Sequence, residues 1–370
     1  MGVEWAIGLM SGTSMDGIDL AAIRTDGERL VDRGSSHFVA YDAAFRSRLE
    51  RALSDAKAIV RRDERPGDLA SVEAEITDRH VAAVSAFRGK LAAEGIEPKL
   101  IGFHGQTVLH RPAEALTVQL GDGRKLANET GLTVIYDLRA NDMTHGGQGA
   151  PLVPAYHAAL ANSLPEAERR FPVCFVNIGG ISNVTWIGET GDPVAFDSGP
   201  GNALIDQWVA RMGGVPFDAD GRIAASGRMA EAVVKHYLAS PFFAKRGPKS
   251  LDRLDFTLDE AEGLSLEDGA RTLAALSAAA ILKARENMPA PPKLWILCGG
   301  GRKNPHIFSD LVAGAGSLVK PAEDVGLDGD AMEAEAWAYL AVRSLKGLPI
   351  TFPTTTGCRE AVSGGVLARP

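Results

Sequence analysis

Apolar and polar positions near the start of the chain predict two β-strands joined by a tight polar turn. Residues 7–10 and 18–23 are apolar runs, and the segment between them holds Gly, Ser, Thr and Asp. A second stretch, 171–187, repeats this plan with a Gly-rich turn at Asn177–Asn183. The repetition predicts an internally duplicated protein with two similar lobes, each presenting a turn to a shared cleft.

Between these two hairpins the apolar spacing changes to that of helices. Apolar residues in 43–95 recur at helical spacing around Arg65-Pro66-Gly67, so two amphipathic helices with a turn between them are predicted. Short strands and one helix follow, at Leu100–Phe103, Leu116–Leu120, Thr133–Tyr136 and Pro151–Leu160. Strands that alternate with helices predict an α/β lobe.

The second lobe is predicted to begin near Phe171 and to have the same mixed character. After its hairpin we expect a strand at Val194–Phe196, a helix at Asn202–Met212, helical segments near 226–239 and 265–287, and an irregular loop near the cleft at Ser240–Phe256. The predicted division is 1–165 for the first lobe, with 350–370 returning to it, and 166–349 for the second lobe.

Composition limits the partners that the protein is expected to bind and the cellular compartment in which we expect it. The chain has 370 residues, 45% of them apolar, and a formal charge of −8, which argues against a general nucleic-acid or anionic-membrane surface. Three cysteines without Cys-x-x-Cys spacing give no disulfide scaffold or structural zinc site, and we expect no protein-bound structural metal. Without a leader or a sufficiently long apolar run, we expect a cytoplasmic protein.

The turn of the first hairpin has the chemistry of a phosphate-holding loop. Two glycines let the backbone approach a ligand, and three hydroxyl residues add donors: Gly12, Gly17, Ser11, Thr13 and Ser14. Asp16 and Asp19 would repel bare phosphate, so we expect Mg²⁺ between them and the ligand. An ordinary hairpin with a polar turn is the alternative, because neither the Walker pattern nor the dinucleotide fingerprint is present.

A third element is the apolar run Leu294–Cys298, which leads directly into Gly299-Gly300-Gly301. Three glycines after a strand let a flat group lie against the backbone, although such a triplet alone is also typical of a tight turn. In this order, the two hairpins and the glycine triplet match the nucleotide-binding plan of the actin, hexokinase and Hsp70 superfamily.

Longer strings narrow the resemblance within that superfamily. From residue 7 to about residue 357, the chain resembles the anhydro-N-acetylmuramic acid kinase family in GLMSGTSMDG (8–17), GFHGQT (102–107), GGQGAPL (146–152), NIGGISN (177–183), FDSGPGN (196–202) and GDAMEAE (329–335). Ser198 stands where the family pattern has Thr, a change that keeps the hydroxyl.

The resemblance implies an α/β, two-lobed actin-like ATPase fold, with RNase H-like lobes around a deep nucleotide cleft. It implies ATP and Mg²⁺ as cofactors, an amino-sugar substrate and a homodimer. The nucleotide-binding residues that it implies are Gly12, Thr13, Ser14, Met15, Asp16, Gly17, Ile18, Asp19, Asn177, Gly179, Gly180, Gly299, Gly300 and Asn304.

Asp197 is the catalytic residue that the resemblance implies. It follows a predicted strand and precedes a turn that opens a helix, so an aspartate that caps the helix is the alternative. In the family this position is the general base. It takes a proton from the water that opens the 1,6-anhydro bridge, while the freed O6 accepts the γ-phosphoryl group of ATP.

Four polar residues are expected to bind the sugar. Glu333 is assigned by resemblance, and a solvated helix face is the alternative. His104, Gln106 and Arg139 stand beside apolar strands, where each is also compatible with an ordinary polar turn residue. Arg139 is the best partner for the lactyl carboxylate, because a guanidinium binds a carboxylate through two parallel hydrogen bonds.

Two other functions stay open on the sequence. The first is another sugar or acid kinase of the same superfamily, which a substrate screen would separate. The second is a non-kinase ATPase binding module, which ATP turnover without any sugar would favour.

Overall fold

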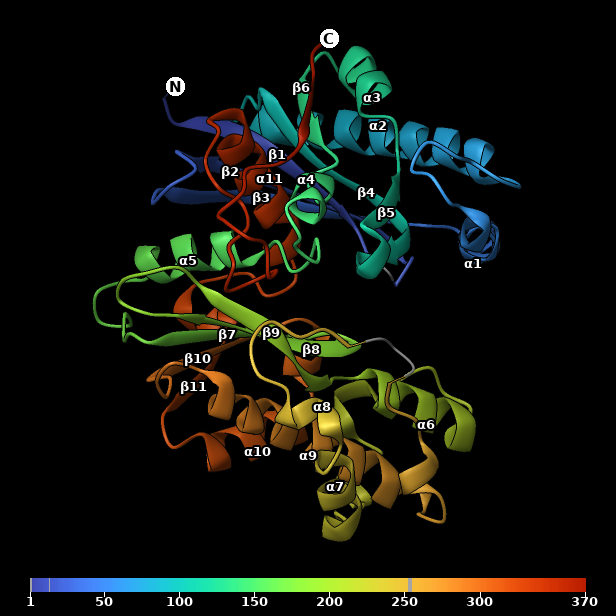
Figure 1. Cartoon of the computed structure of the whole chain (residues 1–370), viewed down its shortest axis with the longest axis vertical. Helices are drawn as coiled ribbons and strands as arrows, with labels where there is room; N and C mark the ends of the chain where they lie inside the picture. Colours follow the sequence, from blue (N-terminus) through green and yellow to red (C-terminus); the bar gives the residue numbers. More distant parts are fainter. Residues whose placement is uncertain (1, 13, 252–254) are drawn as a thin grey trace. The chain divides into compact units, whose positions relative to one another are not determined.

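The computed structural model describes residues 2–12, 14–251 and 255–370, which form two compact units (Figure 1). Unit 1 holds the residues up to Ser163 together with Ala331–Pro370, and unit 2 is Leu164–Asp330. The first predicted boundary, at 165, lies within two residues of this division. The second differs, because the structure changes unit after Asp330 whereas the prediction did so after residue 349.

Unit 1 is built around a mixed sheet with the strand order β12-β6-β4-β1-β2-β3, and β5 pairs with β4. Strands β1, β2 and β3 are antiparallel neighbours, whereas β4 runs parallel to β1 and β6 runs parallel to β4. The strands are β1 Glu4–Ser11, β2 Gly17–Thr25, β3 Val31–Ala40, β4 Leu100–Arg111, β5 Leu116–Leu120, β6 Thr133–Tyr136 and β12 Val366–Ala368.

Unit 2 repeats the central part of this sheet, in the order β11-β10-β7-β8-β9. Its first three strands are again antiparallel neighbours, and β10 and β11 continue the sheet in parallel on the other side of β7. The strands are β7 Val173–Ile178, β8 Ile181–Ile187, β9 Val194–Pro200, β10 Leu294–Cys298 and β11 Leu318–Pro321. The predicted duplication and the α/β fold class with RNase H-like lobes are therefore confirmed.

The helices of unit 1 cover its sheet from two directions. Apolar residues of α1, α2 and α3 pack with those of the strands in one core, whereas α11 packs on β1, β2 and β4. The helices are α1 Ala43–Asp55, α2 Leu69–Ala93, α3 Gly123–Thr130, α4 Ala140–Thr144, α5 Pro154–Ser163 and α11 Met332–Leu345. The two predicted helices in 43–95 are confirmed, whereas α3 and α4 were not predicted.

Glycines in the sheet let α11 lie unusually close to it. A Cβ atom on Gly8 would stand 1.7 Å from the carbonyl oxygen of Ala334, and one on Gly102 would stand 2.0 Å from that of Trp337. Any side chain at these positions would push the helix away, because these are backbone contacts. This close approach explains why Ala331–Leu345 belongs to unit 1 and not, as predicted, to the second lobe.

In unit 2 the central helix is α9, whose Ala-rich sequence is almost wholly buried against β8, β9 and neighbouring helices. The helices are α6 Ala203–Gly213, α7 Glu231–Leu238, α8 Pro241–Ala244, α9 Leu266–Lys283 and α10 Pro305–Ala315. Within the described residues, no helix of either unit has the length and apolar character that crossing a membrane requires.

Candidate functional site

The β1–β2 turn of unit 1 is short and internally hydrogen-bonded. The hydroxyl of Ser14 donates to Oδ1 of Asp16 at 2.6 Å, and the amide of Met15 donates to the carbonyl of Gly12 at 3.2 Å. Ser14 and Asp16 are exposed. The turn therefore presents a hydroxyl and a carboxylate to solvent, whereas Thr13 lies outside the described residues.

The other predicted contacts of this turn divide into open and packed positions. A Cβ atom on Gly12 would meet nothing closer than 3.5 Å, so a ligand can approach its backbone. At Gly17 it would stand 2.4 Å from the carbonyl of Val39, so we attribute this glycine to strand packing. The side chains of Met15 and Ile18 are buried in the core, so a ligand could contact these two residues only through their backbone. The side chain of Asp19 is partly exposed.

Strand β4 supports the turn from the neighbouring position in the sheet. The hydroxyl of Ser11 donates to the carbonyl of Gly105 at 2.8 Å, and Nε2 of Gln106 donates to the carbonyl of Gly12 at 3.0 Å. Nδ1 of His104 lies 3.1 Å from the carbonyl oxygen of Ser11. His104 and Gln106 are 4% and 1% exposed, so the structure joins them to the turn as buried residues.

Arg139 lies beside His104, immediately before α4. Its Nη1 donates to the carbonyl of Gly149 at 2.8 Å, its Nη2 donates to Nε2 of His104 at 3.0 Å, and its guanidinium lies 5.5 Å from the ring centre of Trp337. Burial lowers the pKa of Arg139 to about 10, and the negative charge of Glu333 opposes this shift. Arg139 therefore stays charged at neutral pH, with Glu333 near enough to act on it.

Two buried carboxylates that the sequence analysis did not select hold this region. Oδ2 of Asp142 accepts from the amide of Gly149 at 2.6 Å, and its Oδ1 accepts from the hydroxyl of Thr356 at 2.6 Å. Glu335 accepts from the hydroxyl of Tyr156 at 2.8 Å. Asp142 thus fixes the loop whose carbonyl binds Arg139, and Glu335 joins α11 to α5.

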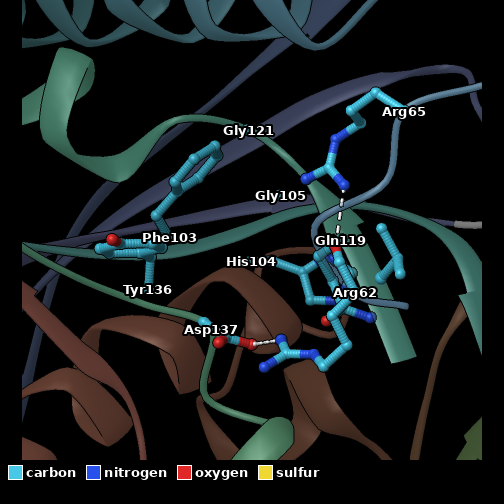
Figure 2. A pocket seen from close by; sticks show the side chains of 10 residues that line it. Arg62, Arg65, Phe103, His104, Gly105, Gln119, Gly121, Tyr136 and Asp137 are labelled. Carbon is cyan, nitrogen blue, oxygen red and sulfur yellow. Dashed lines mark hydrogen bonds and ion pairs between the residues drawn. The ribbon is translucent and has the colours of Figure 1, made fainter. Parts of the chain in front are cut away.

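A cavity of about 120 Å³ opens at the ends of β4, β5 and β6, and His104 lies in its wall (Figure 2). The ion pair between Arg62 and Asp137, 2.5 Å long, crosses one side of it. Oε1 of Gln119 is buried without a hydrogen-bond partner. Arg65 also lines the cavity, and its guanidinium is paired with Glu73.

In unit 2 the second Gly-rich turn and the glycine triplet lie together. The carbonyls of Gly179 and Gly180 accept from the amides of Asn202 and Gly201, at 2.7 and 3.0 Å. A Cβ atom on Gly299 would stand 2.3 Å from Oδ1 of Asn177. Residues 177–180, 201–202 and 299 therefore form one group at the ends of β7 and β10.

Two glycines of this group, and the neighbouring Gly300, leave space beside their backbone. A Cβ atom would meet nothing closer than 3.5 Å at Gly179, 3.6 Å at Gly180 and 3.9 Å at Gly300. Asn304 has a structural task, because its Oδ1 caps α10 by accepting from the amides of His306 and Ile307. The open glycines are thus the better candidates for ligand contact.

Arg302 anchors the glycine triplet, although the sequence did not single it out. Its side chain is 5% exposed, and its Nη1 donates to the carbonyl of Gly299 at 3.0 Å and to Asp330 at 2.8 Å. Its Nη2 donates to Glu323 at 2.6 Å. A fully paired buried guanidinium of this kind fixes the backbone to which it donates.

Asp197 lies within β9 and not in a turn, because the strand continues to Pro200. The residue at the N-terminus of α6 is Asn202, so the helix-cap alternative for Asp197 is wrong. Oδ2 of Asp197 accepts from the amide of Leu251 at 2.8 Å, and its own amide donates to the carbonyl of Lys249 at 2.9 Å. Within the loop predicted at 240–256, residues 249 and 251 therefore lie against Asp197, whereas Pro241–Ala244 forms α8 and 252–254 lie outside the described residues.

The surroundings of Asp197 raise its pKa to about 6. Burial is the main cause, and the amide of Leu251 and the charge of Lys249 oppose it. Lys249 is itself 8% exposed, with Nζ 3.2 Å from the carbonyl of Phe242 and 4.4 Å from the centre of that ring. A partly desolvated carboxylate whose pKa lies near neutrality has the property that a general base requires.

Replacing Lys249 by Met is expected to raise the pKa of Asp197 further, because the nearby positive charge that stabilises the carboxylate is lost while the backbone bond from Asp197 remains. The acidic limb of a pH–rate profile should then move to higher pH by about one unit or less. Lys245→Met, on the same segment but exposed, is the control. An unchanged limb in Lys249→Met would show that this charge does not act on Asp197.

Ser198, the one departure from the family pattern, is buried and hydrogen-bonded between strands. Its hydroxyl donates to the carbonyl of Ser182 at 3.0 Å and lies 2.6 Å from the hydroxyl of Ser182. A Thr hydroxyl would meet the same partners. The departure therefore keeps the hydroxyl that joins the two strands.

The duplicated sheet order, with a Gly-rich turn after the first strand of each unit, is that of the actin, hexokinase and Hsp70 superfamily. Comparison with known proteins narrows this class. The family model described as anhydro-N-acetylmuramic acid kinase matches residues 4–369. The chain belongs to this family.

Similar relatives cover the whole chain. The anhydro-N-acetylmuramic acid kinase of Rhizobium etli is 58% identical over 100% of this chain and 99% of its own length. That of Agrobacterium fabrum is 56% identical, covering 99% of each. Among solved structures, a ROK family glucokinase from Streptomyces griseus is 15% identical with a TM-score of 0.41, covering 92% of this chain and 99% of its own.

Proposed function

We propose that this protein is an ATP-dependent kinase that opens 1,6-anhydro-N-acetylmuramic acid with water and phosphorylates O6. The products are N-acetylmuramic acid 6-phosphate and ADP, and the reaction serves peptidoglycan recycling. Family membership over residues 4–369 supports the substrate and the reaction. The structural observation that carries the proposal is the partly buried carboxylate of Asp197, which accepts from the amide of Leu251 and has a raised pKa.

Asp197 acts in this proposal as the general base. The bridged sugar has no free 6-hydroxyl, so a water molecule must attack the anomeric carbon while Asp197 takes one of its protons. The bond between the anomeric carbon and O6 breaks, O6 bonds to the γ-phosphorus, and the β–γ bridging oxygen leaves with ADP. The amide of Leu251 holds one carboxylate oxygen and so fixes the direction in which the other accepts a proton.

The nucleotide is bound in this proposal by the Gly-rich turns of both units and by the glycine triplet. The open glycines Gly12, Gly179, Gly180 and Gly300 offer backbone to a phosphate or to the adenosine. Phosphoryl transfer depends mainly on positioning and on neutralising charge. Fixed backbone donors supply both without rearranging during the reaction.

Asp16 and Asp19 fit the proposed Mg²⁺, because carboxylate oxygens are the ligands it prefers and Asp16 is exposed at the turn. No group of three or more His, Cys, Asp or Glu side chains within the described residues is arranged to hold a metal ion. The ion would therefore share its coordination with phosphate oxygens and water. When bound, it neutralises phosphate charge.

The sugar is bound in this proposal by Arg139 and Glu333. The charged guanidinium suits the lactyl carboxylate, and Glu333 accepts hydrogen bonds from hydroxyl groups. Both side chains belong to unit 1, where the charge of Glu333 acts on Arg139. From the family resemblance we further propose a homodimer located in the cytoplasm.

A substrate panel tests the proposal. ADP release is measured with Mg-ATP alone and with 1,6-anhydro-N-acetylmuramic acid, N-acetylglucosamine, N-acetylmannosamine or glucose. The proposal expects turnover that depends on the anhydro sugar. Preference for a sugar with a free 6-hydroxyl would indicate another sugar kinase, and equal turnover without sugar would indicate an ATPase module.

The pH dependence of kcat/KM should report the protonation of Asp197. Its pKa is raised from 3.8 to about 6, and only the unprotonated carboxylate accepts a proton, so activity should fall tenfold per pH unit below about pH 6. Rates at constant ionic strength between pH 4.5 and 8.5 measure this, with the coupling enzymes in excess. A plateau that extends down to pH 4.5 would contradict a base with this pKa.

A further inference from the structure

We infer that His104 is a positioning residue that links Arg139 to the backbone of the β1–β2 turn, and not a direct ligand of the sugar. The inference rests on the proposed function, in which Arg139 binds the sugar and the turn binds the nucleotide. One buried imidazole therefore connects the two binding regions of unit 1 by two hydrogen bonds.

The hydrogen bonds of His104 determine which ring nitrogen carries the proton. A guanidinium only donates, so Nε2 of His104 must accept from Nη2 of Arg139, 3.0 Å away. Nδ1 then carries the hydrogen and donates to the carbonyl of Ser11, 3.1 Å away. Both polar atoms of the ring are used, which leaves no imidazole nitrogen for a sugar hydroxyl.

Burial keeps His104 in this neutral form. Burial and the charge of Arg139 hold the pKa of His104 well below its ordinary value. The ring also packs against Trp337, with ring centres 4.6 Å apart. A single tautomer in a fixed orientation transmits a displacement of Arg139 to Ser11 without first rearranging.

The carbonyl of Ser11 sets the direction of a donor in the turn. The peptide between Ser11 and Gly12 is planar and trans, so its C=O and N–H groups point in opposite directions. Holding the carbonyl toward His104 therefore points the N–H of Gly12 away from β4. Gln106 holds the next carbonyl, that of Gly12, in a second bond of the same kind.

The backbone that carries His104 is itself fixed. The pairing of β1 with β4 shifts register between Leu9 and Ser11, which places Gln106 opposite Ser11. Gly105 has a φ of 71°, and a Cβ atom there would stand 2.6 Å from the carbonyl of Leu120. Only glycine fits this bend, and the bend brings His104 and Gln106 to the turn.

This arrangement makes the two binding events interdependent. A carboxylate that binds Arg139 fixes the guanidinium, which fixes His104 and through it the peptide of Ser11. By thermodynamic reciprocity, nucleotide binding to the turn must strengthen sugar binding by the same factor. We expect each ligand to improve the affinity for the other several-fold.

Two amide substitutions separate the two bonds of His104. In His104→Asn the amide nitrogen stands near the position of Nδ1, so it keeps the bond to Ser11 and loses the acceptor for Arg139. In His104→Gln the amide oxygen reaches the position of Nε2, so it keeps the bond from Arg139 and loses the donor to Ser11. Gln106→Met removes only the bond to Gly12.

The variants are expected to differ in which ligand they weaken. His104→Asn should weaken the binding of the sugar alone about tenfold and leave the Kd of the nucleotide alone within about twofold. His104→Gln should instead weaken the binding of the nucleotide alone and leave the Kd of the sugar alone within about twofold. Gln106→Met should raise KM for ATP alone. In both His104 variants, titration calorimetry should show that the effect of the sugar on the affinity for a non-hydrolysable ATP analogue has disappeared.

Other outcomes would overturn the inference. If both His104 variants weaken the binding of the sugar alone and leave the binding of the nucleotide alone unchanged, His104 is a sugar ligand. If both variants lower kcat and Tm and change the Kd values of sugar and nucleotide to the same extent, the role of His104 is general packing. Wild-type protein without sugar-dependent turnover would instead refute the proposed function, and nucleotide affinities of the three variants would still test the link to the turn.

Discussion

Asp197→Asn is expected to lower kcat/KM for 1,6-anhydro-N-acetylmuramic acid by about 100- to 10,000-fold, the usual contribution of a general base. The amide has nearly the same shape and keeps an oxygen that accepts from the amide of Leu251, so the fold should be retained. It cannot take a proton from water at neutral pH. Initial rates of ADP release and Tm are measured on the same preparations.

The control is Asp192→Asn, the same chemical change at an exposed position in the loop before β9. It should leave kcat/KM within about twofold of the wild-type value. Sugar affinity, measured by calorimetry in the absence of ATP, should also be retained in Asp197→Asn. Wild-type rates in Asp197→Asn would remove Asp197 from the mechanism, and loss of sugar affinity alone would make it a binding residue.

Gly8→Ala is expected to destabilise unit 1 by about 3 kcal/mol or more. The new Cβ atom would stand 1.7 Å from the carbonyl oxygen of Ala334 and 2.7 Å from the amide of Ala338, so α11 must move off the sheet. For a unit of this size the loss corresponds to a decrease in Tm of roughly 6–12 °C. Scanning calorimetry with and without nucleotide measures it.

Gly89→Ala is the matched control for this prediction. Gly89 is exposed near the end of α2, and a Cβ atom there would meet nothing within 4 Å. Alanine favours a helix over glycine by about 1 kcal/mol, so Tm should stay the same or rise. If Gly8→Ala also leaves Tm unchanged, α11 does not lie against β1 as described, and its place in unit 1 is wrong.

The duplicated sheet was predictable because its signals are local. Apolar runs bounded by glycines mark β1, β2, β7 and β8, and a pattern repeated later in the chain needs no knowledge of the tertiary structure. The unit to which α11 belongs was not predictable in this way. An apolar helical face does not say which sheet it covers, and the decisive close contacts at Gly8 and Gly102 come from residues more than 200 positions away.

The candidate site, like the fold, could be predicted from the sequence only in part. The sequence selected Asp197, but not the burial that raises its pKa, nor the groups of Lys249 and Leu251 that oppose this shift, the latter 54 residues further along the chain. Arg139 and His104 were selected separately, and their mutual hydrogen bond appears only in the folded chain. A polar residue within an apolar strand can be recognised in the sequence, whereas the hydrogen-bond partners of its side chain cannot.

The glycines of the first turn show the same limit of prediction from sequence. The sequence treated Gly12 and Gly17 alike, as positions where a ligand approaches the backbone. In the structure only Gly12 is open, and Gly17 is packed against β3. A glycine that admits a ligand and one that admits a neighbouring strand have the same sequence signature, so the structure is needed to tell them apart.

The measurement that tests the central claim most directly is the origin of the anomeric oxygen in the product. The protein is incubated briefly with Mg-ATP and 1,6-anhydro-N-acetylmuramic acid in ¹⁸O-water, and the products are analysed by mass spectrometry. Product made in ordinary water and then held in ¹⁸O-water for the same time corrects for exchange. The account predicts N-acetylmuramic acid 6-phosphate with ¹⁸O on the anomeric carbon and none in the phosphate. Unlabelled sugar phosphate, or label released only in inorganic phosphate, would contradict it.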